Sequence, residues 1–179
     1  MPKIDIRPAI KEDIPLLTAL DHNYTSDYVW QLDVRSEEGQ VNVSFRQTRL
    51  PRSVRVEYPR HPQRLSEDWE KRSTILVALL ESDVIGYISL DQNLAPVTNW
   101  ITDLVVVRRM RRQGVGSALL LAAQDWARQS NNYRMVLEMQ PKNYPCICLA
   151  QKLGFDFCGY NDHYYPNHDI ALFFAKSIR

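Results

Sequence analysis

Apolar and polar positions repeat with two different periods along the chain, and their order predicts a mixed α/β fold. Residues 3–9, "KIDIRPA", alternate as a strand does, and residues 11–20 place Ile14, Leu16, Leu17 and Leu20 on one side of a short helix. From residue 74 the pattern predicts two apolar strands around the turn "ESD", a buried strand in "NWITDLVVV" and a helix over 115–129. A strand in "YRMVLEM", a helix ending at Gly154 and two further strands complete the chain.

Residues 21–66 interrupt this plan. Alternation on both sides of "SEEGQ" predicts a β-hairpin from about Val29 to Gln47, and a second extended piece follows near Val54 to Tyr58, so that the inserted hairpin region spans about 29–60. Acidic residues dominate before the turn, and arginines recur after it, at positions 46, 49, 52, 55, 60 and 64. These charges suit either two solvated faces of the hairpin or a charged wall of a binding cleft, and both interpretations stay open.

Composition and length narrow the class of protein. The 179 residues fit one domain, 1–179, and the formal net charge of +1 argues against a dedicated nucleic-acid-binding domain. No apolar run approaches the roughly 20 residues of a membrane helix, and the first residues lack the apolar stretch of a signal peptide, so we expect a cytoplasmic protein that does not enter the membrane. The three cysteines include no C-x-x-C pair, which predicts neither a disulfide framework nor a metal site but small, mostly buried residues.

An arginine-rich loop, "RRMRRQGVGSALLL", stands between a buried strand and a helix. Gly114 and Gly116 remove side chains where the loop is tightest, so successive backbone N–H groups can converge on an anion, aided by the helix dipole and the arginines. The spacing is not that of a P-loop, and Leu119 stands where G-x-G-x-x-G would have its third glycine. We therefore predict a site for a pyrophosphate.

The stretch "DLVVVRRMRRQGVGSALL" resembles the acetyl-CoA signature R/Q-x-x-G-x-G/A of the GNAT N-acetyltransferase superfamily, on Arg111, Gly114 and Gly116. Further along, "LEMQPKNYPCICLAQKLGF" resembles the second half of that fold, a strand followed by Asn and a helix that ends in Gly-Phe. The resemblance implies an α/β (α+β) GNAT fold with a mixed, mostly antiparallel central sheet flanked by helices. It implies a cofactor core over about 74–176, an inserted segment over about 21–66, and acetyl-CoA (coenzyme A) as the cofactor.

The resemblance also implies how the cofactor is held. The strand at Leu104 to Val107 would carry a β-bulge whose freed N–H polarises the thioester carbonyl. It would splay from the strand at Met135 to Met139, leaving a gap for the pantetheine arm, while the amides of 113–117 hold the pyrophosphate. The cofactor-binding residues implied are Leu104, Val105, Val106, Arg111, Arg112, Gln113, Gly114, Val115, Gly116, Ser117 and Asn143.

Acetyl transfer requires that the acceptor amine lose a proton, because an ammonium with a pKa of about 10 is protonated at neutral pH. Glu138 is our candidate catalytic base, since strand alternation sets it opposite to Leu137 and Met139 and lets it face the cleft. Protein N-terminal acetyltransferases of this superfamily carry a glutamate in a similar position. A structural carboxylate is the alternative interpretation.

The general acid is less well defined, because Ala150 stands where many family members have a tyrosine. Tyr144, Tyr164, Tyr165 or solvent could replace it. We favour Tyr164 as the second catalytic residue, since "YNDHYYPNHDIALFF" resembles the tail of the N-terminal acetyltransferases; a packing role is the alternative. Cys148 is expected to pack in the core, because direct attack by the amine needs no acyl-cysteine.

These observations favour an acetyl-CoA-dependent N-acetyltransferase that transfers the acetyl group directly to a primary amine. We favour a small-molecule amine, as in streptothricin acetyltransferase-like members, because the inserted hairpin could cover the cleft that a peptide needs. Alternatives are a ribosomal-protein-type enzyme acting on a peptide N-terminus and a non-catalytic acyl-CoA-binding sensor, which Ala150 would suit. A nucleic-acid partner for the arginine array is disfavoured because no aromatic stacking platform accompanies it; a homodimer stays open.

Overall fold

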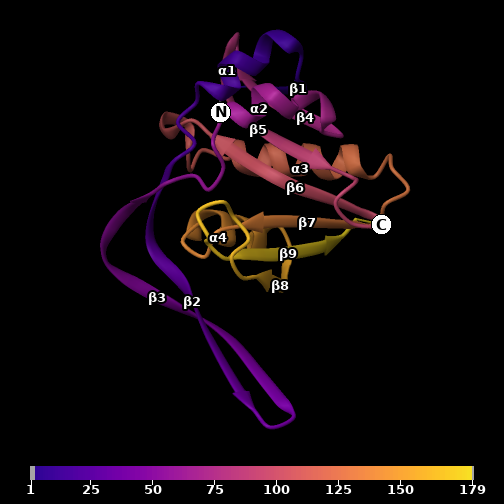
Figure 1. Ribbon diagram of the computed structural model, residues 1–179. Helices are drawn as coiled ribbons and strands as arrows, with labels where there is room; N and C mark the ends of the chain where they lie inside the picture. The colour runs from indigo at the N-terminus through magenta and orange to yellow at the C-terminus, as the bar shows by residue number, and fades with distance from the viewer. Residues whose placement is uncertain (1–2, 179) are drawn as a thin grey trace.

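A seven-stranded sheet forms the centre of the computed structural model, which describes residues 3–178 (Figure 1). Its strand order is β1-β4-β5-β6-β7-β9-β8. Neighbouring strands are antiparallel except for β6 and β7, which are parallel, so the predicted mixed, mostly antiparallel sheet is confirmed. The strands are β1 (Ile4–Pro8), β4 (Thr74–Leu80), β5 (Asp83–Asp91), β6 (Thr98–Val106), β7 (Arg134–Met139), β8 (Asp156–Asn161) and β9 (Ala171–Ser177).

Helices cover both faces of this sheet because its strands bury apolar side chains on both. On one face, α1 (Ile14–Thr18) and α2 (Gln63–Asp68) pack with Val77, Tyr87 and Val105. On the other, α3 (Val115–Ala127) and α4 (Tyr144–Lys152) share a larger core with Ile101 and Leu137. Burial on both sides explains why β4 and β5 are mostly apolar. Three short 3-10 turns, η1 (Lys11–Asp13), η2 (Trp69–Lys71) and η3 (Arg108–Met110), complete the connections.

The insertion is a long two-stranded hairpin, β2 (Tyr24–Glu37) and β3 (Gln40–Val56), that projects from the body (Figure 1). The predicted hairpin from Val29 to Gln47 and the extended piece near Val54 to Tyr58 largely belong to this one ribbon, because β2 extends back far enough to pair with the end of β3. An irregular stretch interrupts the pairing between Ser26 and Tyr28, and Pro51, which has no N–H to donate, falls opposite it.

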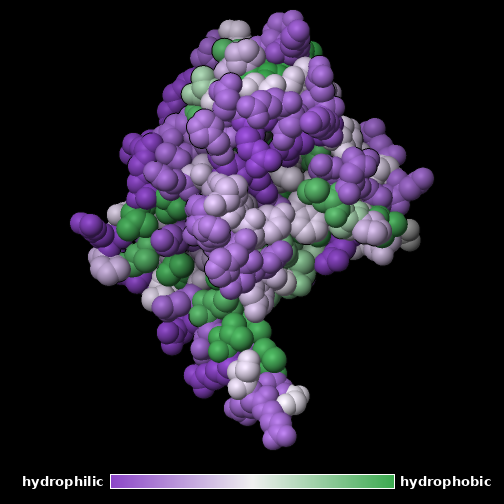
Figure 2. All heavy atoms as spheres, in the orientation of Figure 1, coloured by the Kyte–Doolittle hydropathy of each residue, from purple (hydrophilic) through white to green (hydrophobic). Residues whose placement is uncertain are grey.

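Backbone and aromatic contacts anchor the middle of the hairpin to the body. The backbone N–H of Trp30 donates to the carbonyl of Pro141 at 3.0 Å, and the Trp30 and Phe45 rings contact the ring of Phe157. Figure 2 shows hydrophobic surface where the ribbon leaves the body and hydrophilic residues at its tip. The insertion is therefore fixed to the body near its middle, and the part toward the turn projects.

Several local expectations differ from the structure. Leu16 is 53% exposed because the helix is a short turn around Pro15 that buries Ile14 and Leu17 instead. The pattern did not predict α2 or η2. The expectation of mostly buried cysteines is wrong: Cys148 faces outward on α4 and Cys158 lies on the edge strand β8, so both are exposed. The helix stop at Gly154 is confirmed, with φ of 78° just after α4.

Gly86 on β5 should be indispensable to the sheet, because a Cβ at this position would lie 2.5 Å from the backbone carbonyl oxygen of Val105. We expect Gly86→Ala to lower the free energy of unfolding by about 2 kcal/mol or more. Gly39→Ala, at the open hairpin turn with φ of 74°, is the matched control and should cost about 1 kcal/mol. Urea denaturation measures both; equal losses would contradict the close approach of the two strands.

Candidate active site

The parallel strands β6 and β7 part in the middle of the sheet. They pair from Thr98 and Arg134 to Ile101 and Leu137, and no further. Beyond that point β6 continues along β5, and β7 continues along β9. The predicted parting of these strands is therefore confirmed, and it leaves a gap between their facing edges.

A β-bulge in β6 lies where the parting begins. Ser89 pairs with Asp103 and Leu90 with Ile101, so Thr102 is the additional residue. The prediction placed the bulge within Leu104 to Val107, and this position is wrong, because residues 104–106 pair regularly with β5. Two arginines hold the bulged residue, Thr102, in place. Arg60 donates to the Thr102 carbonyl at 3.0 Å, and Arg72 donates to its hydroxyl at 2.7 Å.

A cavity occupies the gap between the parted strands. Its walls come from β6, β7, the start of α4, the segment after β3 and the loop before β9. Apolar and polar side chains both face it, which suits a ligand with an apolar arm and a polar reacting end. The lining residues are Tyr58, Pro59, Arg60, Thr102, Leu104, Leu137, Glu138, Met139, Gln140, Asn143, Cys146 and Tyr165.

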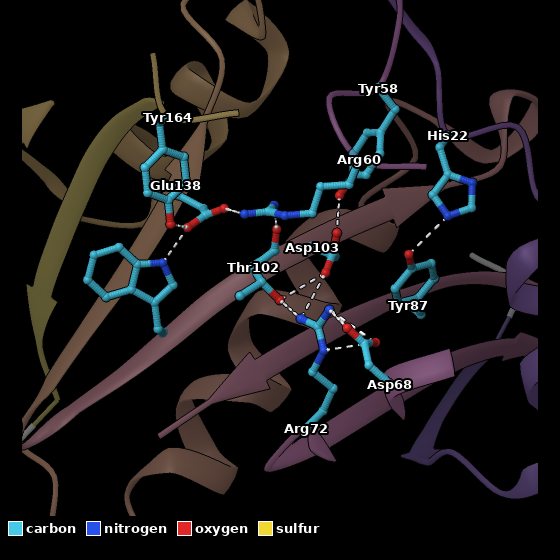
Figure 3. A network of polar contacts seen from close by, with 11 residues as sticks. His22, Tyr58, Arg60, Asp68, Arg72, Tyr87, Thr102, Asp103, Glu138 and Tyr164 are labelled. Atoms are coloured by element: carbon cyan, nitrogen blue, oxygen red, sulfur yellow. Dashed lines mark hydrogen bonds and ion pairs between the residues drawn. The ribbon is translucent and has the colours of Figure 1, made fainter. Parts of the chain in front are cut away.

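Glu138 points from β7 into a cluster of donors (Figure 3). One carboxylate oxygen forms an ion pair with Arg60, and the other accepts from the Trp100 indole at 2.5 Å and the Tyr164 hydroxyl at 2.8 Å. The side chain has no exposed surface, so its charge is stabilised by these three partners. Burial raises the pKa of the Tyr164 phenol, and the neighbouring Glu138 charge raises it further, which keeps this donor protonated at neutral pH.

A second buried carboxylate, Asp103, anchors the opposite side of the gap (Figure 3). It accepts hydrogen bonds from the hydroxyls of Tyr58 and Thr102, and Arg72 lies 3.5 Å away. Arg72 also pairs with Asp68 of α2 at 3.1 Å. This set ties the bulge to the helix that precedes β4. Neither Asp103 nor Arg72 stood out in the sequence, because no motif connects them.

The loop before α3 presents backbone donors at the end of β6. Gly114 is the N-cap of α3 with φ of 88° and no side-chain cap, and the place that a Cβ would take there is open. The first helical hydrogen bond runs from the Ala118 N–H to the Gly114 carbonyl, so the amides of residues 115–117 precede the ladder. Because such amides and the helix dipole favour an anion, the geometry suits the predicted pyrophosphate site.

Three of the predicted cofactor-binding residues make contacts within the protein that hold the fold together. The Arg111 guanidinium donates to the carbonyls of Val106, Asp21 and Asn23, so it ties the loop to the start of the hairpin, and burial lowers its pKa. A Cβ on Gly116 would lie 3.2 Å from Leu149, so this glycine allows α3 to approach α4. The Asn143 side chain caps α4 by accepting from the Cys146 N–H at 3.2 Å, and it also lines the cavity.

The other predicted residues divide between the cavity, the loop and the core. Leu104 lines the cavity, whereas Val105 is buried against α1 and α2 and Val106 is half-buried. Arg112 and Gln113 are exposed, and residues 115–117 form the first turn of α3. Ala150 is fully buried, and it is Tyr165 rather than Tyr164 that lines the cavity.

A second cavity adjoins the first and shares Gln140 with it. The Gln140 side chain is held on both sides, because it accepts from the Tyr24 hydroxyl and donates to Asp169, each at 2.6 Å. Charges of both signs surround this space, which suits a polar ligand. The second cavity is lined by Leu50, Val54, Arg55, Val56, Glu57, Gln140, Lys142, Asn167 and Asp169.

Two further findings apply to residues 3–178. None of their helices combines the length and the apolar character that crossing a bilayer requires. Their His, Cys, Asp and Glu side chains do not gather in a group of three or more that could hold a metal ion.

The chain is similar to a known protein family and to several of its members. Residues 43–155, more than half of the chain, match the model of the acetyltransferase (GNAT) family. A streptothricin acetyltransferase of Streptomyces lavendulae is 25% identical over 168 residues, which cover 90% of this chain and 86% of the relative. An N-alpha-acetyltransferase of Sulfurisphaera tokodaii is 31% identical over 120 residues, which cover 61% of this chain and 72% of the relative.

A solved structure also resembles the chain over nearly its full length. It comes from Bacillus anthracis and is assigned as a streptothricin acetyltransferase in complex with acetyl coenzyme A. The TM-score is 0.76 at 22% sequence identity, with 98% of this chain and 99% of that chain covered. At this identity the likeness supports the fold.

His22, buried beside the site, should make stability depend on pH. Burial lowers the pKa of His22, so the unfolded chain, with a histidine pKa of about 6.5, binds a proton at a higher pH than the folded chain. The free energy of unfolding is therefore unaffected by the titration of His22 above a pH of about 6.5. It falls as the pH drops below that value, by up to about 1.4 kcal/mol per pH unit. Denaturation of the wild type and His22→Gln between about pH 7.5 and 5.5 should show a smaller loss in the variant. His61→Gln, at an exposed position, is the control; identical losses in all three proteins would contradict the assignment.

Proposed function

Because the chain belongs to the acetyltransferase (GNAT) family, its activity is the acetylation of an amine by acetyl-CoA, and we propose that the acceptor is the primary amine of a small molecule. The observation that carries this proposal is the enclosure of the gap between β6 and β7. Arg60, from the segment after the hairpin, forms an ion pair with Glu138, and its guanidinium lies 5.1 Å from the ring centroid of Tyr165, from the loop before β9. A peptide acceptor would need this side of the gap to be open.

The chain offers acetyl-CoA two binding elements that lie at the same end of β6. Acetyl-CoA supplies an activated thioester when bound, and its diphosphate suits the amides of residues 113–117 at the start of α3. We propose that its arm occupies the gap, against Leu104, Met139 and Asn143. Arg111 would act from behind the loop, by holding its backbone in place through three carbonyls.

The relatives support a small acceptor by how much of the chain they match. The relative named for streptothricin matches 90% of the chain, and the N-alpha-acetyltransferase matches 61%. The second cavity also provides a polar space beside the reacting groups, where Glu57, Lys142 and Asp169 can contact the remainder of a polar amine. We propose that the acceptor enters from this side.

Acetylation of a protein N-terminus is the second candidate. It is favoured by the 31% identity to an N-alpha-acetyltransferase and by the contact between Glu138 and Tyr164, two residues whose surroundings resemble that class of enzyme. The enclosed gap argues against it.

Glu138 is our proposed proton acceptor, because its carboxylate faces the place where the arm and the amine meet. As the N–C bond forms and the C–S bond breaks, the amine proton would pass to Glu138, and the departing thiolate would take a proton from solvent. No side chain is needed for the second step, since a thiol with a pKa of about 8.5 leaves readily. Tyr164 donates to Glu138, and we therefore propose that it orients this carboxylate rather than protonating sulfur.

Gly114→Val tests the diphosphate site. The variant should weaken acetyl-CoA binding by about tenfold or more, because a branched side chain at φ of 88° would both displace the backbone and occupy the approach to the amides. Gly39→Val, at φ of 74° on the hairpin turn, carries the same backbone strain far from the loop and should bind normally. Calorimetry measures both; unchanged affinity in Gly114→Val would reject this placement.

The acceptor is tested by thiol release from acetyl-CoA with a panel of small primary amines and of peptides with free N-termini. Turnover of small amines without turnover of peptides is the expected result, and acetylation of peptides alone would overturn the proposal.

Glu138→Gln should lower kcat by about 100-fold while acetyl-CoA still binds. Wild-type turnover in that variant would mean that Glu138 is not the base.

A further inference from the structure

We propose that Arg60 is a positioning residue for the transfer, which fixes the gap between β6 and β7 and holds Glu138 in place. This inference rests on the proposed function, in which Glu138 receives the amine proton. Arg60 lies outside the family signature, in the segment that follows the hairpin. In the sequence it is one of six arginines, and the structure separates it from the other five, which are exposed.

The Arg60 guanidinium bridges β6 and β7 at the point where their backbone pairing ends. Ile101 and Leu137 form the last pair of the parallel strands, and the next residue on each strand is Thr102 and Glu138. Arg60 contacts both of these residues at once, donating through Nη1 to the Thr102 carbonyl at 3.0 Å and through Nη2 to the Glu138 carboxylate (Figure 3). A planar fork of donors can bridge two acceptors in this way, whereas a single ammonium cannot fix both directions.

Arg60 is itself held on several sides. Its guanidinium lies over the Tyr165 ring, with the centroid 5.1 Å away, and the side chain is 18% exposed. The preceding Tyr58 is anchored to Asp103 on β6. The cation is therefore placed before any ligand arrives, and it fixes the width of the gap and the direction of the carboxylate together.

The fixed charge also bears on the amine. A cation in the cavity disfavours the ammonium form of a bound acceptor and favours the neutral amine, which is the form that attacks. The charged and titratable groups that surround Arg60 come from every neighbouring element. They are Glu138, Asp103, Tyr58, Tyr164, Tyr165 and, more distantly, Tyr87 and Arg72.

Kinetics of Arg60→Met, Arg60→Lys and the control Arg64→Met test the proposal. In Arg60→Met we expect kcat to fall by about 100-fold. The acidic limb of the kcat–pH profile should also move to higher pH by about one unit or more, because Glu138 loses its counter-charge and the bound ammonium is no longer repelled by the Arg60 cation. Arg60→Lys keeps the charge, so its limb should stay near that of the wild type, while kcat falls by about tenfold because the bridge is lost. Arg64→Met, at an exposed position of α2, should behave as the wild type.

A double variant separates this proposal from the proposed function. If Arg60 acts mainly through Glu138, Arg60→Met should lower kcat far less in the Glu138→Gln background than the 100-fold or so expected in the wild type. A fall in kcat with an unmoved acidic limb in Arg60→Met would assign Arg60 a purely structural role and overturn the inference. Should Arg60→Met fail to fold, Arg60→Lys decides, since wild-type kcat in that variant would contradict the bridge. Because these comparisons use whichever acceptor the wild type accepts, turnover of peptides alone would reject the small-molecule acceptor and leave this test intact.

Discussion

The early end of the pairing between β6 and β7 is the constraint on which the rest of the site depends. Two parallel strands in the middle of a sheet normally satisfy each other's backbone groups, and a buried group left without a partner is costly. Here the pairing stops at Ile101 and Leu137. The bulge at Thr102, the bridging guanidinium of Arg60 and the cavity between the strands all lie at that point. The gap is therefore a structured part of the sheet, and polar side chains contact the two strands where they part.

The insertion is connected to this constraint more closely than its projecting shape suggests. The segment after β3 supplies Tyr58 and Arg60, which contact the two parted strands. At the other end, Arg111 binds the carbonyls of Asp21 and Asn23, so the loop before α3 is tied to the start of β2. One insertion thus contacts both proposed halves of the site, the diphosphate loop and the reacting end. A change in the base of the hairpin would reach both.

Much of the fold and part of the site could be predicted from local patterns. Alternation located the strands of the sheet, and the spacing of Gly114 and Gly116 located the loop before α3, because both signals depend on neighbouring residues. The parting of β6 and β7 came from the family resemblance. Arg60 could not be found, because its contact with Glu138 spans 78 residues and no periodicity encodes such a distance. The bulge was misplaced because a single additional residue leaves little trace in an apolar run.

A structure of the chain with acetyl-CoA bound would show whether the gap between β6 and β7 is the cofactor site. We expect the arm of acetyl-CoA between β6 and β7, its diphosphate on the amides that begin α3, and Arg60 still bridging Thr102 and Glu138. A cofactor bound on another face of the sheet, with the space between the two strands filled by side chains, would contradict this placement.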